Sequence, residues 1–206
     1  MQVYTTETEQ VDAIKRFLST NGKYLAVGLV LGIGALIGWR YWQTHQTNQL
    51  HGTAAVFEKL NKSLASGSKE SVVAVEKFAN ETNNIYGVMA DLELAKQAIT
   101  QNDLAQAETN LLVASGKAKD KDMQALSDIR LARVQLAEDK TDAALKTLEL
   151  VKGKGWQVMV EDIRGDILTK KGDIAGARAA YSMGLGSDGP QVIKEFMKIK
   201  LNNLSN

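Results

Sequence analysis

Hydrophobic residues follow two different patterns along the chain. Between Tyr24 and Trp42 they are almost continuous, and sixteen successive residues, 24–39, carry no charge. Nineteen residues of helix span about 28 Å, close to the hydrocarbon thickness of a bilayer. Beyond Trp42, apolar residues instead recur at helical spacing among charged ones. The pattern therefore predicts an all-α protein, with a single N-terminal transmembrane helix over 24–42 followed by amphipathic helices.

Aromatic residues lie at both ends of the apolar segment. Tyr24 begins it, and Trp39, Tyr41 and Trp42 end it, which suits rings that prefer the headgroup level of a membrane. A buried core helix, the first alternative, rarely needs four glycines and an aromatic belt. A cleaved signal peptide, the second, has a shorter apolar region followed by a small-x-small cleavage site. The sequence therefore favours an uncleaved signal-anchor.

Basic residues on the two flanks predict the orientation of this helix. Lys15, Arg16 and Lys23 precede it, whereas Arg40 lies at its other end and the next basic residue is Lys59. The flank richer in Lys and Arg usually faces the cytoplasm. We therefore expect a single-pass protein of the bacterial inner membrane, with its N-terminus cytoplasmic and its C-terminal domain periplasmic. The expected parts are a cytoplasmic segment 1–23, a transmembrane helix 24–42 and a periplasmic domain 43–206.

Composition excludes several functions. After Trp42, 21 basic residues balance 21 acidic ones, so no nucleic-acid-binding surface is expected. The chain has no Cys, and its two histidines, His45 and His51, are six residues apart. That spacing places them on different helix faces, unlike a zinc-binding pair. No nucleophile stands in a catalytic motif with a general base, so we expect neither an enzyme nor a cofactor.

A degenerate repeat fills the second half of the chain. Its register is set by three alanines, 37 and 33 residues apart, each with a small residue twelve positions earlier and a large one four positions later. These sets are Ala107, Ala144 and Ala177; Ala95, Ala132 and Gly165; and Leu111, Leu148 and Tyr181. Five residues before each alanine stands Asn102, Asp139 or Gly172, types that tolerate the left-handed backbone ending a helix. Each unit is therefore predicted to be a helix, a tight turn and a second helix.

This pattern resembles the tetratricopeptide repeat, a helical hairpin of 34 residues. The usual aromatic near the start of the first helix is replaced by Asp91 and Asp128. An irregular fourth hairpin is expected over 53–65 and 71–80, and a final helix over 191–204 should cover the last repeat, as terminal units must. The expected fold is thus a tetratricopeptide-like solenoid with a concave face.

Two motifs suggest chemistry that their context does not support. Residues 184–189 fit G-x-G-x-x-G, but they follow a helix expected to end at Tyr181, whereas a nucleotide-binding loop follows a strand. We interpret them as a glycine-rich helix exit. Adjacent Glu161 and Asp162 are expected to lie on a solvated polar face.

The candidate partner-binding residues lie on the first helix of each hairpin, which lines the concave face in tetratricopeptide arrays. Apolar residues with an occasional Lys or Arg suit a flexible or extended polypeptide. The rows predicted to face this side are Met89, Leu92, Lys96 and Ile99; Leu126, Ile129, Arg133 and Leu136; and Met159, Asp162 and Asp166.

Four glycines in the apolar segment form two G-x-x-x-G pairs, Gly28 with Gly32 and Gly34 with Gly38. Small residues allow helices in a membrane to approach closely. One pair is expected to pack against a partner helix, although glycine is also simply frequent in membrane helices.

Segments at both ends of the chain, and one in its repeats, resemble one family. The segments that carry the likeness are AIKRFL (13–18), NGKYLAVG (21–28), GIGALIGWRYW (32–42), LARVQL (131–136) and KIKLNNL (198–204). The chain is similar over nearly its whole length to the YfgM family, ancillary subunits of the bacterial Sec translocon. The resemblance implies association with the translocon channel, with a membrane-anchored periplasmic chaperone of the isomerase class, and with exported polypeptides. An alternative is a membrane tether whose cytosolic segment, residues 10–17, holds a signalling regulator.

Overall fold

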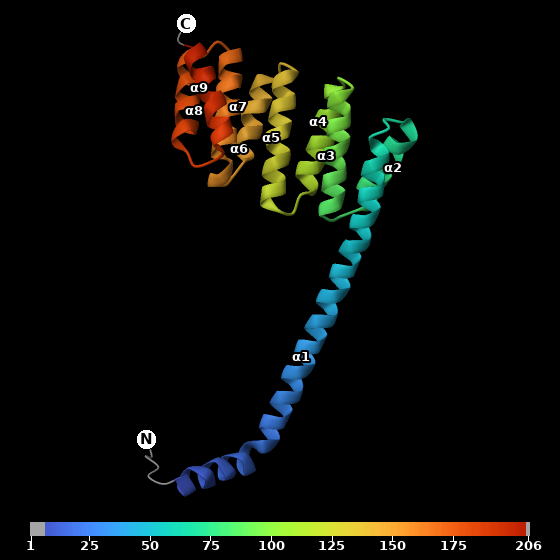
Figure 1. Cartoon of the computed structure of the whole chain (residues 1–206), viewed down its shortest axis with the longest axis vertical. Helices are drawn as coiled ribbons and strands as arrows, with labels where there is room; N and C mark the ends of the chain where they lie inside the picture. Colours follow the sequence, from blue (N-terminus) through green and yellow to red (C-terminus); the bar gives the residue numbers. More distant parts are fainter. Residues whose placement is uncertain (1–6, 205–206) are drawn as a thin grey trace. The chain divides into compact units, whose positions relative to one another are not determined.

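The computed structural model describes residues 7–204, without the side chains of 7–9, 46, 48 and 49. Every regular element in this range is helical (Figure 1). The elements are α1 (Glu7–Leu64), α2 (Lys69–Glu81), α3 (Ile85–Thr100), α4 (Leu104–Lys117), α5 (Lys121–Ala137), α6 (Thr141–Leu150), the short 3₁₀ helix η1 (Lys154–Trp156), α7 (Gln157–Lys170), α8 (Ile174–Gly186) and α9 (Gln191–Asn203). The predicted all-α class is confirmed.

The chain divides into two compact units, Met1–Thr53 and Ala54–Asn206. The described part of the first unit is helical throughout and belongs to α1, which contains the one candidate membrane span in the part of the chain that the structure describes. Its apolar side chains are exposed, for example Leu31 at 67% and Leu36 at 68%. Apolar surface of this extent is unfavourable in water and favourable in hydrocarbon.

Three successive hairpins, α3–α4, α5–α6 and α7–α8, form the body of the second unit, whose residues 54–204 are called the repeat domain below. Ala107, Ala144 and Ala177 are completely buried, because these small side chains let the two helices of each hairpin approach closely. Leu111 and Tyr181, one turn further on, are also buried. The predicted repeat register is therefore confirmed.

The turn inside each hairpin has the expected left-handed residue. Asn102, Asp139 and Gly172 have φ of 59°, 64° and 79°. Asn and Asp tolerate this conformation better than most residues with a side chain, and Gly adopts it freely. In the first and third hairpins, the Asp that follows the left-handed residue caps the second helix. The Asp103 carboxylate accepts a hydrogen bond from the backbone N–H of Gln106, and that of Asp173 accepts one from the backbone N–H of Gly176.

Both ends of the array are covered. At the start, the last turns of α1 join α2 and α3 in a hydrophobic cluster that includes Phe57, Leu64 and Val75, so the irregular fourth hairpin, which precedes the three repeats, is also confirmed. At the end, α9 buries Met197 completely against α8. The expectation that α8 stops at Tyr181 is wrong, because the helix continues to Gly186. A Cβ at Gly184 would lie 2.6 Å from the Met197 methyl group, so the absence of a side chain there gives the end of Met197 its room.

Candidate partner-binding surface

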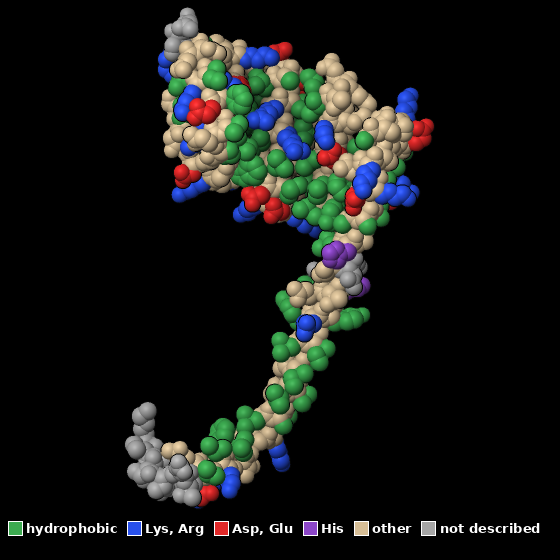
Figure 2. Space-filling model, viewed as in Figure 1, with side chains coloured by type: hydrophobic (Ala, Val, Ile, Leu, Met, Phe, Trp, Pro, Cys, Tyr) green, Lys and Arg blue, Asp and Glu red, His purple; other side chains and the backbone are tan. Residues whose placement is uncertain are grey.

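Three of the predicted residues form a half-buried apolar row on the first helices. Met89 of α3, Leu126 of α5 and Met159 of α7 occupy the same position in successive repeats, and each keeps part of its side chain exposed. In Figure 2, hydrophobic side chains cover much of the visible face of the repeat domain, with Lys and Arg set among them. Such a surface combines flexible thioethers, apolar area and charge, as surfaces that accept varied partners do.

Two predicted residues contribute core rather than surface. Leu92 is 5% exposed and packs in the cluster shared by α3, α4 and α5. Ile129, its equivalent in the next repeat, is 2% exposed and packs with residues of α6 and α7. They support the backbone beneath the apolar row and offer almost no area to a partner. The third residue at this position, Asp162, is also buried.

The charged members of the row differ along the array. Lys96 and Arg133 are exposed, and Lys96 donates to Glu93 on its own helix at 3.1 Å. Arg133 lies 4.0 Å from the Asp162 carboxylate. Asp162 also accepts a 2.8 Å bond from Lys200 of α9, so the final helix neutralises the acidic end of the row.

The expectation that Glu161 and Asp162 are solvated is wrong. Glu161 is 6% exposed and Asp162 is 7% exposed. Asp162 is held by Lys200, while Glu161 pairs with Arg164 at 3.4 Å. Sequence reasoning missed these partners because Lys200 is 38 residues away from Asp162 and belongs to the terminal helix.

Glu93 and Arg130 belong to the same surface but were not predicted. They follow Met89 and Leu126 by four residues, which places them on the same helix face. Glu93 is half-buried and Arg130 is exposed. The repeat register contained the signal, since 93 and 130 are 37 residues apart like the alanines of the first two hairpins.

A groove of about 400 Å³ lies at the start of the row. It separates the last turns of α1 from α3, and Lys62 and Leu64 face Glu93, Lys96 and Gln97 across it. Among the pockets formed by the described residues, this groove is the one lined by a predicted contact residue, Lys96. An extended segment entering it would meet both charged and apolar groups.

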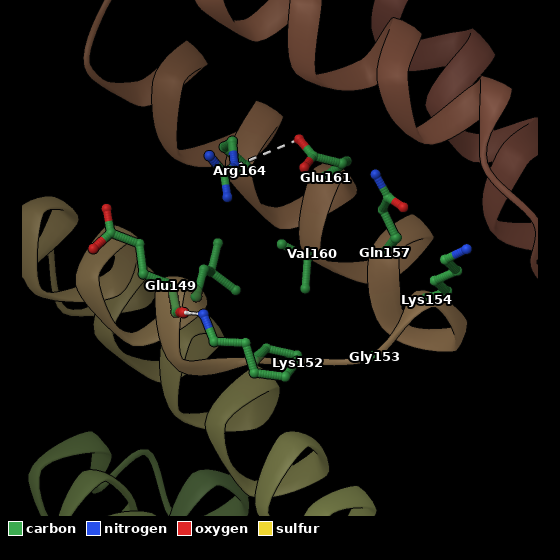
Figure 3. Close-up of a pocket in the computed structure, with 10 residues that line it drawn as sticks. Glu149, Lys152, Gly153, Lys154, Gln157, Val160, Glu161 and Arg164 are labelled. Carbon is green, nitrogen blue, oxygen red and sulfur yellow. Dashed lines mark hydrogen bonds and ion pairs between the residues drawn. The ribbon is translucent and has the colours of Figure 1, made fainter.

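A second hollow, of about 480 Å³, lies between the end of α6 and α7 (Figure 3). Lys152 turns back to donate to the Glu149 carbonyl oxygen at 2.6 Å, and Arg164 pairs with Glu161. Lys152, Glu161 and Arg164 are therefore bonded within the chain rather than open to a ligand. Among the described residues no group of three or more His, Cys, Asp or Glu side chains is placed to hold a metal ion.

Buried carboxyl groups recur at one position of the first helices, where tetratricopeptide repeats usually have an aromatic. Asp91, Asp128 and Glu161 are 4%, 1% and 6% exposed. Burial raises the pKa of each carboxyl, opposed by Lys117 beside Asp91, by the Ser115 hydroxyl beside Asp128 and by Arg164 beside Glu161. The three groups therefore differ in how well their charge is compensated.

Asp128 is the least compensated of the three, and Asp128→Asn should stabilise the repeat domain at neutral pH by roughly 1 kcal/mol. Ser115 donates to one oxygen at 2.5 Å, but Oδ2 is buried with no hydrogen-bond partner among the described residues. Because the folded-state pKa is raised, wild type loses stability as pH rises through that pKa. The advantage of the variant should shrink on acidification, measured by urea unfolding at several pH values. An equal change from the exposed Asp188→Asn, or no pH dependence, would contradict the explanation.

Comparison with known proteins extends over the whole array and the apolar helix. A family model described as a tetratricopeptide repeat-like domain matches residues 15–206. A protein of Escherichia coli named "Ancillary SecYEG translocon subunit" is 44% identical over 205 residues, covering all of both chains. Proteins of the same name from Haemophilus influenzae and Aggregatibacter actinomycetemcomitans are 34% and 32% identical, each over 98% of this chain and 99% of the relative. No solved structure matches the chain significantly.

The hairpins, the covered ends and the family match define a tetratricopeptide repeat-like protein with a candidate membrane span in α1. The chain belongs to the YfgM family of ancillary SecYEG translocon subunits. The resemblance expected from the ends of the sequence is thereby confirmed.

Proposed function

We propose that this chain is a non-enzymatic, single-pass inner-membrane protein that associates with the SecYEG translocon. The observation that carries the proposal is the 44% identity to the Escherichia coli subunit over the full length of both chains. Affinity purification of the tagged chain from detergent-solubilised membranes tests it. SecY, SecE and SecG should copurify, and recovery of the chain without them would refute the association.

The proposed topology places residues 1–23 in the cytoplasm, residues 24–42 across the membrane and residues 43–206 in the periplasm. It is supported by the exposed apolar side chains of α1, such as Leu31, and by the basic residues that precede them. A protease added to intact spheroplasts should digest the repeat domain. Protection of that domain until the membrane is opened would reverse the orientation.

The proposed role of the repeat domain is to bind polypeptides that emerge from the translocon and a membrane-anchored chaperone of the isomerase class. In this way it links translocation to periplasmic chaperones. The support is the row formed by Met89, Leu126 and Met159, which offers apolar contact beside the cations Lys96 and Arg133. Such a surface holds an extended chain through many weak contacts and needs no catalytic group.

Removing the two exposed cations of the row, by Lys96→Gln with Arg133→Gln, should weaken polypeptide capture by about three- to tenfold. Exposed charges at the rim of an interface steer association and orient the bound chain, so their loss lowers affinity without removing the apolar contacts. Photo-crosslinking from Met89 in both backgrounds, with quantification of captured exported proteins and chaperone, measures the change.

A matched pair on second helices controls for total charge. Lys69→Gln with Lys146→Gln removes two exposed lysines of α2 and α6, away from the row. This control should capture as much polypeptide as wild type. If both double variants lose capture equally, binding depends on net charge rather than on the row.

Replacing one glycine pair of the span, by Gly28→Leu with Gly32→Leu, should reduce copurification with the translocon or its chaperone. At each of the four glycines, a Cβ would meet no other part of the described chain within 4 Å, which leaves their surface open to a partner helix. Larger side chains would separate the two backbones and remove the close packing that associates membrane helices.

The other pair supplies the matched control. Gly34 follows Gly28 by six residues, which places it about 120° from Gly28 by the shorter way around the helix, so Gly34→Leu with Gly38→Leu changes a different face. Copurification of this variant should be retained while that of the first is lost. If neither variant loses its partner, the glycines face lipid and the contact lies in the repeat domain.

A further inference from the structure

An apolar strip lies on α1 just before the candidate membrane span. It consists of Val11, Ile14, Phe17 and Leu18, which are 49%, 59%, 56% and 51% exposed. At about 100° per residue these four positions fall within one third of the helix circumference. Ile14, Phe17 and Leu18, together with Gln10 and Ala13, line a shallow apolar hollow. Nothing else in the described chain covers this strip.

The rest of the helix circumference is polar and mainly basic. Lys15 is exposed at the edge of the strip, and Arg16 and, further along, Lys23 are exposed on the opposite side. Asp12 is the one acidic residue among the described side chains of these turns. A helix with large apolar residues on one side and Lys or Arg on the other is suited to the membrane–water interface. Anionic headgroups attract the cations while the apolar side enters the acyl boundary.

Residues 19–22, between the strip and the span, form a part of the helix that is prone to bend. The Ser19 hydroxyl donates to the Arg16 carbonyl oxygen at 2.9 Å, and the side-chain amide of Asn21 donates to the Phe17 carbonyl oxygen at 3.3 Å. Side chains that bond to the carbonyls of the preceding turn favour bending, as does Gly22. The first turns of α1 do run at an angle to the turns that follow (Figure 1).

We propose that residues 10–18 form an interfacial helix that lies on the lipid surface at the N-terminal side of the span. The inference rests on the proposed insertion of α1 in the membrane. Tyr24 follows Leu18 by six positions, about 9 Å of helix, so the strip begins within reach of the headgroups. The strip therefore continues the lipid-facing surface of the span, and its basic back remains in water. A lipid surface suits both faces at once, whereas a protein partner on the strip would leave the cations without a role.

Nitroxide scanning of the full chain in vesicles of phosphatidylethanolamine and phosphatidylglycerol tests the proposal. The chain has no Cys, so each label needs one substitution. Labels at Ile14→Cys and Leu18→Cys should be several-fold more accessible to oxygen relative to a nickel chelate than labels at Asp12→Cys and Arg16→Cys. A label at Leu31→Cys reports insertion of the span.

The outcomes separate the two proposals. If the label at Leu31→Cys is readily accessible to the nickel chelate, the proposed span itself fails. If that label is shielded from the chelate and accessible to oxygen, but positions 12, 14, 16 and 18 are equally accessible to the chelate, the segment projects into water and the inference is overturned. Shielding of position 14 from both reagents would show a protein contact, with a second copy or a soluble regulator, and would also overturn it.

A charge variant checks that the strip itself makes the contact. In Ile14→Glu with Phe17→Glu, the label at Leu18→Cys should become accessible to the chelate, whereas the label at Leu31→Cys should not change. Asp12→Glu with Lys15→Arg, which preserves the charges of the polar face, should leave Leu18→Cys in lipid. Retention of lipid contact in the first variant would mean that the apolar strip does not hold the segment on the membrane.

Discussion

Gly165→Ala should lower the free energy of unfolding of the repeat domain by about 1–3 kcal/mol. A Cβ at this position would lie 2.2 Å from Cε1 of Tyr181, well inside van der Waals contact. The ring has little freedom to move away, because it is 2% exposed and its hydroxyl donates to Asp166 at 2.7 Å. Denaturant unfolding of the chain in detergent, followed by circular dichroism, measures the loss.

Gly116→Ala is the matched control within a helix. A Cβ there meets nothing within 4 Å, and Gly116 lies in the exposed part of α4. Removing a flexible residue from a helix should stabilise the domain by about 0.5–1 kcal/mol. Opposite signs for the two substitutions would establish that Gly165 is required by the contact with Tyr181. Equal effects would place the hairpin register in error.

Lys117→Met should lower the free energy of unfolding of the repeat domain by about 2–3 kcal/mol at neutral pH. This is less than the usual loss on breaking a fully buried ion pair, because the lysine is partly exposed. The Lys117 ammonium donates to Asp91 at 2.9 Å and to the Ala79 carbonyl oxygen at 3.0 Å. It thereby links α4 to α3 and to the end of α2. Methionine keeps the apolar stem but leaves the Asp91 carboxyl, 4% exposed, without its counter-charge.

The pH dependence of this loss has a defined sign. Burial raises the pKa of Asp91 although Lys117 opposes the shift, and removal of the lysine should raise it further. A carboxyl with a raised folded-state pKa stabilises the fold most below its unfolded-state pKa, and that contribution is lost as pH rises through the folded-state value. The difference in the free energy of unfolding between wild type and Lys117→Met should therefore be large at neutral pH and become smaller in acid.

A double-mutant cycle isolates the ion pair. Asp91→Asn in the Lys117→Met background should recover most of the lost stability, because a neutral amide needs no counter-charge. What remains is the cost of the unpaired Ala79 carbonyl. Additive effects of the two substitutions would mean that the carboxylate and the ammonium do not stabilise each other.

The sequence alone predicted the elements that depend on local pattern. The apolar run of α1, the hairpin register and the left-handed turns all follow from residues close together in the chain. Asn102, Asp139 and Gly172 were identified because few residue types tolerate positive φ, and Ala107, Ala144 and Ala177 because close helix packing needs small side chains. These features are repeated, so each repeat supported the assignment of the others.

The candidate surface was predicted only in part, because a first helix in this array has several packed faces. Periodicity places Met89 and Leu92 on one side of α3, yet only Met89 keeps accessible area while Leu92 packs against α4 and α5. Likewise, the sequence predicted a solvated Asp162, but α9 places Lys200, 38 residues later in the chain, beside its carboxylate. Helical spacing determines which residues share a face. Only the neighbours that the tertiary structure stacks against that face determine which of them a partner can reach.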